Sequence, residues 1–259
     1  MTTPYRVPSL KAQFGLAEDP NAPAHITTSA GHKLTRTITP GGHELDSTQP
    51  GFPVYHRRIA NPVPLMSIAT GASLMILGFG LCKIRNIENY TIWYTVGLPL
   101  GMVGNFTASM FAFAEGSTFL ATLAGTLAGL LGGLAICFLP WAGVQASYVV
   151  GAAGNIQQGT LDFYTAVSMV TLVGMVPLFC ILLASLRSSV PVTQSITLII
   201  IALILEGVNN LQYPRPALQT AGGVIFIIVG VTLEYLAVAV MLQEEGLKLL
   251  PVMPLPRVE

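Results

Sequence analysis

Six long apolar segments dominate the pattern of hydrophobic and polar positions over residues 59–243. Each approaches the roughly 20 residues that a helix needs to cross the hydrocarbon core of a membrane. Polar or glycine-rich breaks separate the segments, including a loop expected over 151–162, and the fifth segment is the shortest. The segments cover approximately residues 64–82, 94–113, 118–140, 163–186, 192–209 and 217–242. The pattern predicts an all-α polytopic membrane protein with six transmembrane helices in contact with lipid.

Two polar tails flank this region. Residues 1–58 are rich in proline, glycine, threonine and histidine and show no sustained period, which predicts a disordered N-terminal tail. Residues 244–259 form a short C-terminal tail. Six crossings place both tails on the same side, and the basic residues beside the segments favour the cytoplasm for that side. Those on the tail side are Arg57, Arg58, Arg187 and Lys248, and those on the other side are Lys83, Arg85 and Arg215.

Composition supports the membrane assignment and excludes several functions. The chain is 52% hydrophobic and 9% charged, whereas about a quarter of the residues in soluble domains are charged. A net charge of zero gives no sign of a nucleic-acid partner. The three cysteines lie in or beside apolar segments, and all four histidines lie in the N-terminal tail. We find no nucleophile triad, metal-ligand spacing or nucleotide loop, so we expect neither an enzyme nor a bound cofactor or metal.

Small residues recur at helical spacing in the third and sixth segments. Ala121, Gly125, Gly129 and Gly133 share one helix face, which predicts close packing within the protomer or between protomers. Thr118, Thr122 and Thr126 follow an adjacent face, where they either support packing or line a polar path. Gly222, Gly223 and Gly230 also predict close packing. These surfaces favour a homo-oligomer.

The stretch Asn61-Pro62-Val63-Pro64-Leu65 stands where the tail meets the first segment. Proline donates no backbone hydrogen bond and disfavours helix in the residue before it. The stretch therefore predicts an interrupted helix start with free carbonyls and an amide side chain. Asn61 is either a contact for a permeating anion or the cap of the first helix, and the two roles are compatible.

Other polar residues within the segments are candidates for a transport path. Ser67, Thr70 and Ser73 follow one line on the first helix, where they either contact a solute or bond their own helix carbonyls. Asn105 and Thr107 lie in the second segment. Glu206 and Glu234 are the acidic residues within the late segments and are candidates for carrying a coupled proton. Glu234 is the deeper of the two, whereas Glu206 lies near a segment end and is expected to reach water.

The Asn61–Leu65 stretch resembles the Asn-Pro-Ala-Pro-Leu-Gly-Leu signature of the acetate uptake transporter family. The glycine-rich stretch Gly97–Asn105, the junction Gly116–Phe119 and the ending Leu250–Pro254 are similar to further motifs of that family. With its long N-terminal tail, the chain resembles a fungal-type member. The resemblance implies six helices per protomer, a hexamer, and a path through each protomer for acetate or other small carboxylates.

The resemblance also implies an apolar constriction made of a phenylalanine, a tyrosine and a leucine. These positions correspond here to Thr70, Leu127 and Ile199, so both aromatic rings are missing. Met66 replaces the family's glycine after the first motif. Asn105 stands where the family has glutamine.

Three functions are compatible with these observations. The first is a plasma-membrane transporter of acetate or a related small monocarboxylate, with or without a coupled proton. The second is a channel-like pore for small neutral solutes. The third is a non-transporting sensor or assembly protein of the same family, which the altered constriction keeps in consideration.

Overall fold

The computed structural model describes residues 60–87, 91–186, 188–247 and 249–253. The N-terminal tail expected over residues 1–58 lies outside the described residues. The described chain contains six helical spans that are long and apolar enough to cross a membrane, which confirms the predicted number. They are α2 (Val63–Leu81), the irregular span Thr91–Glu115, α5 (Thr118–Phe138), α7 (Ile156–Ser185), α8 (Val190–Leu211) and α9 (Pro216–Glu244).

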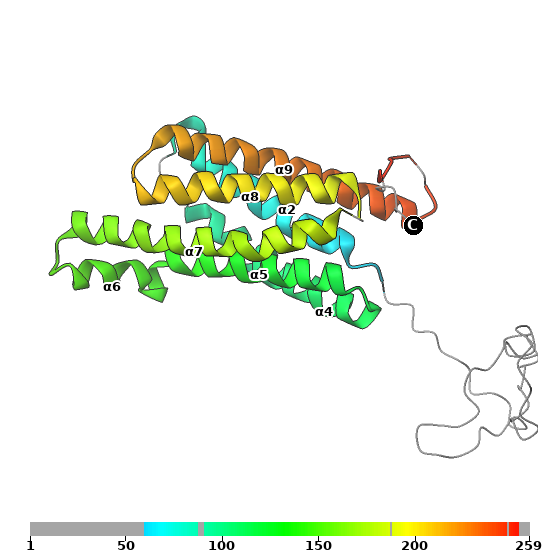
Figure 1. Cartoon of the computed structure of the whole chain (residues 1–259), viewed down its shortest axis with the longest axis horizontal. Coiled ribbons are helices and arrows are strands. Elements are labelled where there is room, and N and C mark those ends of the chain that lie inside the picture. The colour runs from blue at the N-terminus through cyan, green and yellow to red at the C-terminus, as the bar shows by residue number, and fades with distance from the viewer. Residues whose placement is uncertain (1–59, 88–90, 187, 248, 254–259) are drawn as a thin grey trace, which may run out of the picture. The chain divides into compact units, whose positions relative to one another are not determined.

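Successive spans run in alternating directions and form one bundle (Figure 1). One end of the bundle, which we call the Asn61 end, contains the start of α2 and the end of α9. The opposite end, which we call the Tyr213 end, contains the end of α2, the end of α5 and the turn between α8 and α9. Buried apolar side chains from the six spans form a continuous core between these ends.

The structure differs from the sequence prediction in one helix boundary, one additional helix and the relative length of the spans. The stretch 151–162 is not a loop throughout, because α7 begins at Ile156, where the Asn155 side chain accepts a hydrogen bond from the Gln158 amide (3.2 Å). A further helix, α6 (Val144–Gly151), was not predicted. The fifth span is not the shortest: α8 has 22 residues, whereas α2 has 19.

The second span is built from several kinds of helix. It contains η2 (Thr91–Trp93), α3 (Tyr94–Val96), the π-helix η3 (Gly97–Gly104) and α4 (Asn105–Glu115). Pro99 has no backbone N–H, so a regular hydrogen-bond ladder is interrupted inside η3. Wide π turns of this kind occur frequently at functional sites. Asn105 follows η3 directly, and its side chain is completely buried.

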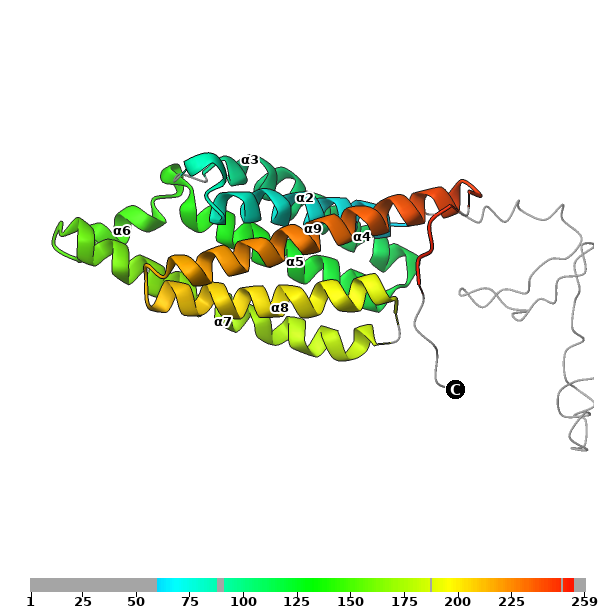
Figure 2. The same ribbon diagram turned by 90° about the horizontal axis from the view of Figure 1, so that it is seen from above.

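The first and last spans approach each other closely through paired glycines (Figure 2). Gly71 of α2 faces Gly230 of α9, and a Cβ on Gly230 would lie 2.8 Å from the Gly71 carbonyl oxygen. Seven residues further along α2, a Cβ on Gly78 would lie 2.5 Å from the carbonyl oxygen of Gly223. The close packing predicted for Gly223 and Gly230 is confirmed, and its partners are the glycines of α2.

The small-residue face of α5 is used only in part within the protomer. Ala121 is buried, and Gly125 faces Ser109 of α4, whose Oγ would lie 3.1 Å from an added Cβ. Gly129 and Gly133 have open space beside them. Thr122 is exposed and donates to its own helix at the Thr118 carbonyl (2.8 Å), so it does not line a path inside the protomer.

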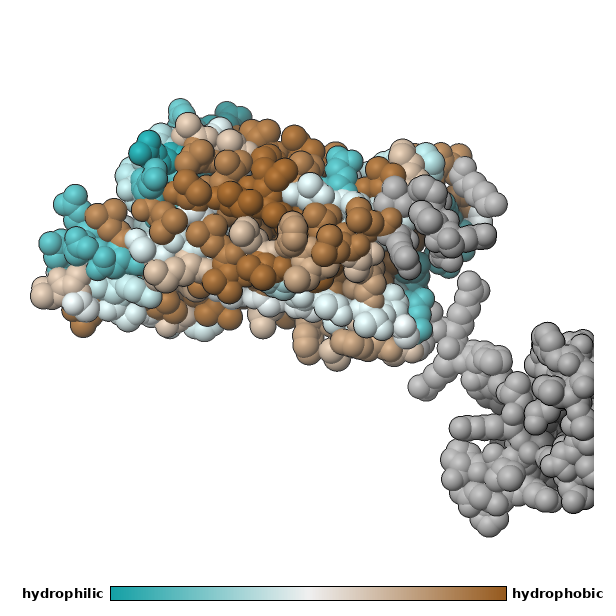
Figure 3. Space-filling view, in the orientation of Figure 1, coloured by the Kyte–Doolittle hydropathy of each residue, from teal (hydrophilic) through white to brown (hydrophobic). Residues whose placement is uncertain are grey.

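The outer surface of the spans is strongly apolar. On the face in Figure 3, hydrophobic residues cover the middle of the bundle and hydrophilic residues gather towards its ends. Helix α7 alone exposes eight large apolar side chains: Ile156, Leu161, Met169, Val170, Val173, Val176, Phe179 and Leu183. In water such a surface would aggregate, whereas in lipid it is the expected outer face.

Candidate functional site

Asn61 is held by two hydrogen bonds at the entrance of α2. Its Oδ1 accepts a bond from the Val63 amide (3.0 Å), and its Nδ2 donates to Glu244 Oε1 near the end of α9 (3.2 Å). The first bond closes a local turn through Pro62. The N-cap position of α2 is occupied by Pro62 and no side chain caps the helix, so the N-cap role weighed for Asn61 is not observed. The second N–H of the Asn61 amide could still donate to an anion, which would then lie beside the Glu244 carboxylate.

Thr70 and Asn105 are brought together in the interior of the bundle. The Thr70 hydroxyl donates to Asn105 Oδ1 (3.0 Å), and Asn105 Nδ2 donates to the carbonyl of Gly101 in η3 (2.8 Å). Both side chains are completely buried. Two residues that the sequence marked separately therefore form one polar connection between α2 and the second span.

The remaining hydroxyls of α2 differ from Thr70. Ser73 donates to the Ala69 carbonyl of its own helix (2.7 Å), while its backbone carbonyl accepts a bond from Trp93 Nε1 (2.9 Å). Ser67 is completely buried, and its hydroxyl has no hydrogen-bond partner among the described residues. The structure thus shows carbonyl bonding for Ser73 and leaves Ser67 available to a solute or a water molecule.

The three positions of the implied constriction are all buried. Thr70, Leu127 and Ile199 are 0%, 5% and 4% exposed. Leu127 and Ile199 belong to the same cluster of buried apolar side chains. Leu127 lies one turn before Leu131, whose Cβ would be 3.4 Å from a Cβ on Gly101, so it faces the second span. A constriction formed by these three residues stays a prediction.

The two candidate glutamates occupy different surroundings. Glu234 is half-buried, and its Oε1 lies over Gly71, 3.2 Å from where a Cβ would be. Glu206 is only 7% exposed, so the expectation that it reaches water at its helix end was wrong. Gly222 of α9 lies against the Glu206 side chain, and Tyr213 of the turn after α8 lines the same cavity.

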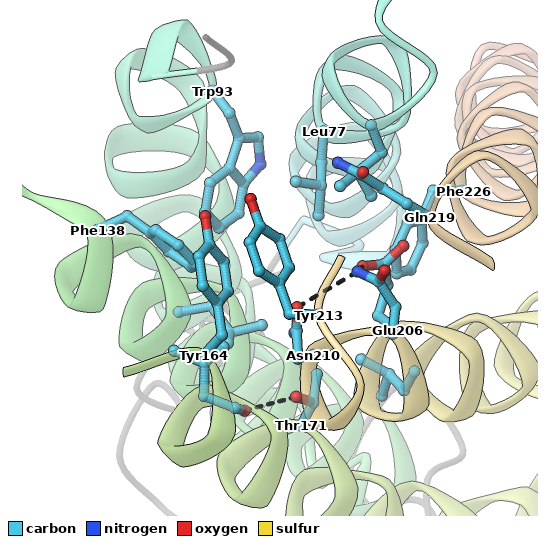
Figure 4. Close-up of a pocket in the computed structure, with 15 residues that line it drawn as sticks. Leu77, Trp93, Phe138, Tyr164, Thr171, Glu206, Asn210, Tyr213, Gln219 and Phe226 are labelled. Atoms are coloured by element: carbon cyan, nitrogen blue, oxygen red, sulfur yellow. Dashed lines mark hydrogen bonds between the residues drawn. The ribbon is translucent and has the colours of Figure 1, made fainter. Parts of the chain in front are cut away.

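Glu206 lines a cavity at the Tyr213 end of the bundle (Figure 4). The cavity offers about 60 Å³ to the centres of water molecules, and roughly 10–15 Å³ holds one water. Most of the lining is apolar or aromatic. The side chains come from all six spans and from the turn after α8, and those used below are Trp93, Phe138, Tyr164, Asn209, Asn210, Tyr213, Gln219 and Phe226.

Aromatic contacts form one wall of this cavity. Tyr213, in the turn after α8, stacks on Tyr164 of α7 with ring centroids 3.8 Å apart and an interplanar angle of 11°. Phe163, the neighbour of Tyr164, packs edge-on against Phe138 of α5 and Tyr148 of α6. Helix α6 therefore supports the wall from outside, which gives this unpredicted element a structural role.

The carboxylate of Glu206 is incompletely bonded by the protein. Its Oε2 accepts one long hydrogen bond from Asn209 Nδ2 (3.5 Å), and its Oε1 has no partner among the described residues. Oε1 lies beside Gly222 of α9, where an added Cβ would be only 2.6 Å away. Burial, and secondarily the charge of Glu206, raise the pKa of the nearby Cys82 thiol.

The sequence did not identify the amide and tyrosine residues around Glu206. Glu206 and Asn209 are three residues apart and so share a helix face, which is a signal that was present. The fifth segment was expected to end at residue 209, and Asn209, Asn210 and Tyr213 were given no role. The described residues contain no group of three or more histidine, cysteine, aspartate or glutamate side chains that could hold a metal ion.

Six apolar spans around buried polar side chains define a multi-pass α-helical membrane protein. A family model described as the GPR1/FUN34/yaaH family matches residues 45–257, so the chain belongs to that family. The predicted resemblance to the acetate uptake transporters is thereby confirmed, while the fungal-type assignment stays a prediction.

One solved structure, described as that of the bacterial acetate channel SatP, is similar to this chain with a TM-score of 0.56. The two sequences are 19% identical, and the match covers 75% of this chain and 99% of the other. At this level of identity the similarity shows a shared fold. No curated protein matches the chain.

Proposed function

We propose that this protein carries acetate or a related small monocarboxylate across the plasma membrane through a path inside each protomer. Family membership and a fold shared with an acetate channel support the class of solute. The observation that carries the proposal is the completely buried Thr70–Asn105 pair. A hydroxyl and an amide in the interior offer a carboxyl group both donors and acceptors in an otherwise apolar bundle.

The solute crosses with a proton in this proposal. None of the six spans contains lysine or arginine, so the interior supplies no fixed positive charge to a carboxylate. An unpaired charge in such surroundings is strongly disfavoured, whereas a neutral carboxylic acid is not. Glu206 and Glu234 are the groups proposed to exchange this proton with the solute or with water.

The same lack of cationic side chains favours one alternative, a pore for small neutral solutes. An interior with hydroxyls, amides and no fixed charge suits such solutes as well as it suits an undissociated acid. The two functions differ in one property, because only transport of an acid depends on the pH on the side from which it enters.

Three further features belong to the proposal. Both termini lie in the cytoplasm, which the basic residues beside the spans support. Residues 59–243 form the transmembrane domain between the two tails. The protomers assemble into a hexamer, for which the open space beside Gly129 and Gly133 on α5 offers a surface of close approach.

The test is uptake of labelled acetate into proteoliposomes at several external pH values, with urea and glycerol as neutral solutes. We expect saturable acetate uptake that rises as the external pH falls. Thr70→Val removes one hydroxyl from the buried pair, and we expect it to reduce uptake at least tenfold. The matched control is Thr232→Val, because Thr232 bonds only the Ile228 carbonyl of its own helix (2.9 Å).

Two results would contradict the proposal. Acetate uptake no faster than in empty liposomes, with folded and inserted protein, would exclude monocarboxylate transport. Rapid, pH-independent entry of urea or glycerol would establish the neutral-solute pore instead.

A further inference from the structure

The cavity at the Tyr213 end combines features that no part of the proposed path explains. It is closed on one side by the stacked rings of Tyr164 and Tyr213 and lies at the end of the bundle opposite Asn61. Glu206 lines this cavity and is more than nine-tenths buried, and its Oε1 has no hydrogen-bond partner among the described residues. A buried acceptor without a partner costs free energy, which a bound group or water can recover.

We propose that this cavity is a binding site for a small monocarboxylic acid, held by one proton shared between its carboxyl group and Glu206. This inference rests on the proposed function and deepens it, because it assigns a place and a protonation state to the substrate. Two ionised carboxylates at hydrogen-bond distance repel each other, whereas a carboxylic acid donates one strong hydrogen bond to a carboxylate. The bound pair therefore contains one proton and one negative charge, whichever group brought the proton.

The rest of the lining matches a molecule with one polar and one short apolar end. The amides of Asn210 and Gln219 line the cavity together with Glu206 and can donate to the remaining carboxyl oxygen. The Asn209 amide donates to Glu206 and to Asn210. Trp93 and Phe226 offer apolar surface for a methyl or ethyl group. A space of about 60 Å³ for water centres accommodates a molecule of a few heavy atoms but not a long acyl chain.

Among the described residues around Glu206, no other charged or titratable side chain supplies a positive charge that could hold the substrate carboxylate in place of the shared proton. Tyr164 and Tyr213 line the cavity, and Cys82 lies near enough for the Glu206 charge to affect its pKa. Phenol and thiol groups cannot become cations by gaining a proton at these pH values, so none of the three pairs with a carboxylate as a positive charge. Arg215 is exposed, and its contact with Asn209 is made by its backbone N–H, which donates to Asn209 Oδ1 (3.1 Å).

A substitution at Gly222 tests the geometry of the cavity without replacing Glu206. A Cβ at this position would lie 2.6 Å from Glu206 Oε1, so alanine must displace the carboxylate or occupy the space beside it. Alanine is otherwise favourable in a helix. The Gly222→Ala substitution therefore acts on the proposed binding geometry and not on the helix itself.

The experiment measures the Kd of acetate for the purified full-length protein in lipid nanodiscs between pH 6 and pH 10. Above the pH at which Glu206 ionises in the free protein, binding must take up one proton, so Kd should rise tenfold for each pH unit, whereas below that pH Glu206 already carries the proton and Kd should level off. Glu206→Gln supplies an N–H donor that needs no proton, and its Kd should not change with pH. Gly222→Ala should weaken binding at least tenfold, while Cys82→Ser should keep the pH slope.

Two matched controls and a charge control complete the design. Glu245→Gln is the same substitution at an exposed carboxylate, and Gly151→Ala fills open space at the end of α6, so both should bind acetate as wild type does. Methylammonium has a similar size and the opposite charge. Competition by methylammonium that strengthens as pH rises would overturn the inference and assign the cavity to cations.

The remaining outcomes also decide the question. A wild-type Kd that does not rise anywhere up to pH 10, no binding at all, or an unchanged slope in Glu206→Gln would each overturn the shared-proton site. If Glu206→Gln does not fold, the pH dependence of the wild-type Kd and the acetate affinity of Gly222→Ala still test the proposed site. Uptake without this site would refute the cavity alone, and binding without uptake would refute the proposed function alone.

Discussion

The Thr70–Asn105 pair and Glu206 are both buried inside an apolar bundle, but the protein completes their hydrogen bonding differently. Thr70 and Asn105 bond each other, and Asn105 also bonds the Gly101 carbonyl. Glu206 receives one long bond from Asn209, and its other oxygen receives none from the described residues. The first arrangement is complete without any ligand, whereas the second is not.

This difference in hydrogen bonding indicates that the two regions make different contributions to stability and to ligand binding. A satisfied buried pair favours a single packing of the helices that carry it, because any other register would leave its polar groups unbonded. An unsatisfied carboxylate stabilises nothing by itself, and its presence indicates a group that binds to it. We therefore expect substitutions in the first region to reduce stability as well as uptake, and those in the second to affect binding without a loss of stability.

The largest expected effect comes from separating α2 from α9, on which both regions depend. In Gly78→Val, the added atoms would overlap the Gly223 carbonyl and the Ile227 side chain. We expect a loss of about 3 kcal/mol or more in the free energy of unfolding, seen as a lower midpoint of thermal unfolding in detergent. Gly129→Val, at a position with open space, is the control. Equal stability of the two variants would show that α2 and α9 are not closely packed.

The next effect tests the satisfied pair directly. Asn105→Leu keeps the approximate volume but leaves the Thr70 hydroxyl and the Gly101 carbonyl without their bonds. We expect a destabilisation of about 2 kcal/mol, measured in the same unfolding experiment. A variant as stable as the wild type would mean that water or another group replaces the amide, and the distinction between the two regions would disappear.

A smaller effect is expected at the half-buried entrance of α2. Asn61→Ala removes the acceptor for the Val63 amide and the donor to Glu244. Loss of such a local turn should reduce stability by about 1 kcal/mol. Glu244→Gln retains an oxygen acceptor for Asn61, so it should reduce stability by less. The opposite order would show that the negative charge of Glu244, and not the turn, fixes the start of α2.

The smallest change in stability is expected at Glu206, where substitution should not destabilise the protein. Without ligand, Glu206→Gln replaces a buried carboxylate by a neutral amide, so stability should be unchanged or higher by up to about 1 kcal/mol. Saturating acetate should raise the unfolding midpoint of the wild type more at pH 6 than at pH 9, because binding stabilises the folded state. A destabilisation as large as that of Asn105→Leu would make Glu206 part of the structural framework.

The six spans were predictable because the length of an apolar run determines whether a helix can cross the membrane. Helix α6 was missed because it is short, contains three valines and lies outside the spans, so no periodic pattern marks it. The early start of α7 was missed because Ile156–Asp162 is polar, although Asn155 followed by a helical turn is a recognisable cap.

The candidate site was predictable residue by residue but not as an arrangement. Thr70 and Asn105 were each identified as polar residues in an apolar run, but their bond joins two spans and cannot be deduced from spacing. Glu206 was assigned to the water-facing end of its segment, because sequence position does not reveal that Tyr213 folds back over it. Gly71 and Gly78 repeat the seven-residue spacing of Gly223 and Gly230, a correspondence that the sequence contains and that was overlooked.

The glycine pairs between α2 and α9 have a consequence for how the protein is made. The first span to leave the ribosome packs closely against the last one, so the helix that starts the bundle cannot find its partner until synthesis is nearly complete. Until then, the face of α2 that contains Gly71 and Gly78 is exposed to lipid or to the insertion machinery. A nascent chain that stops before Pro216 would carry this unpartnered face permanently, which gives cellular quality control a feature by which to distinguish unfinished chains from finished ones.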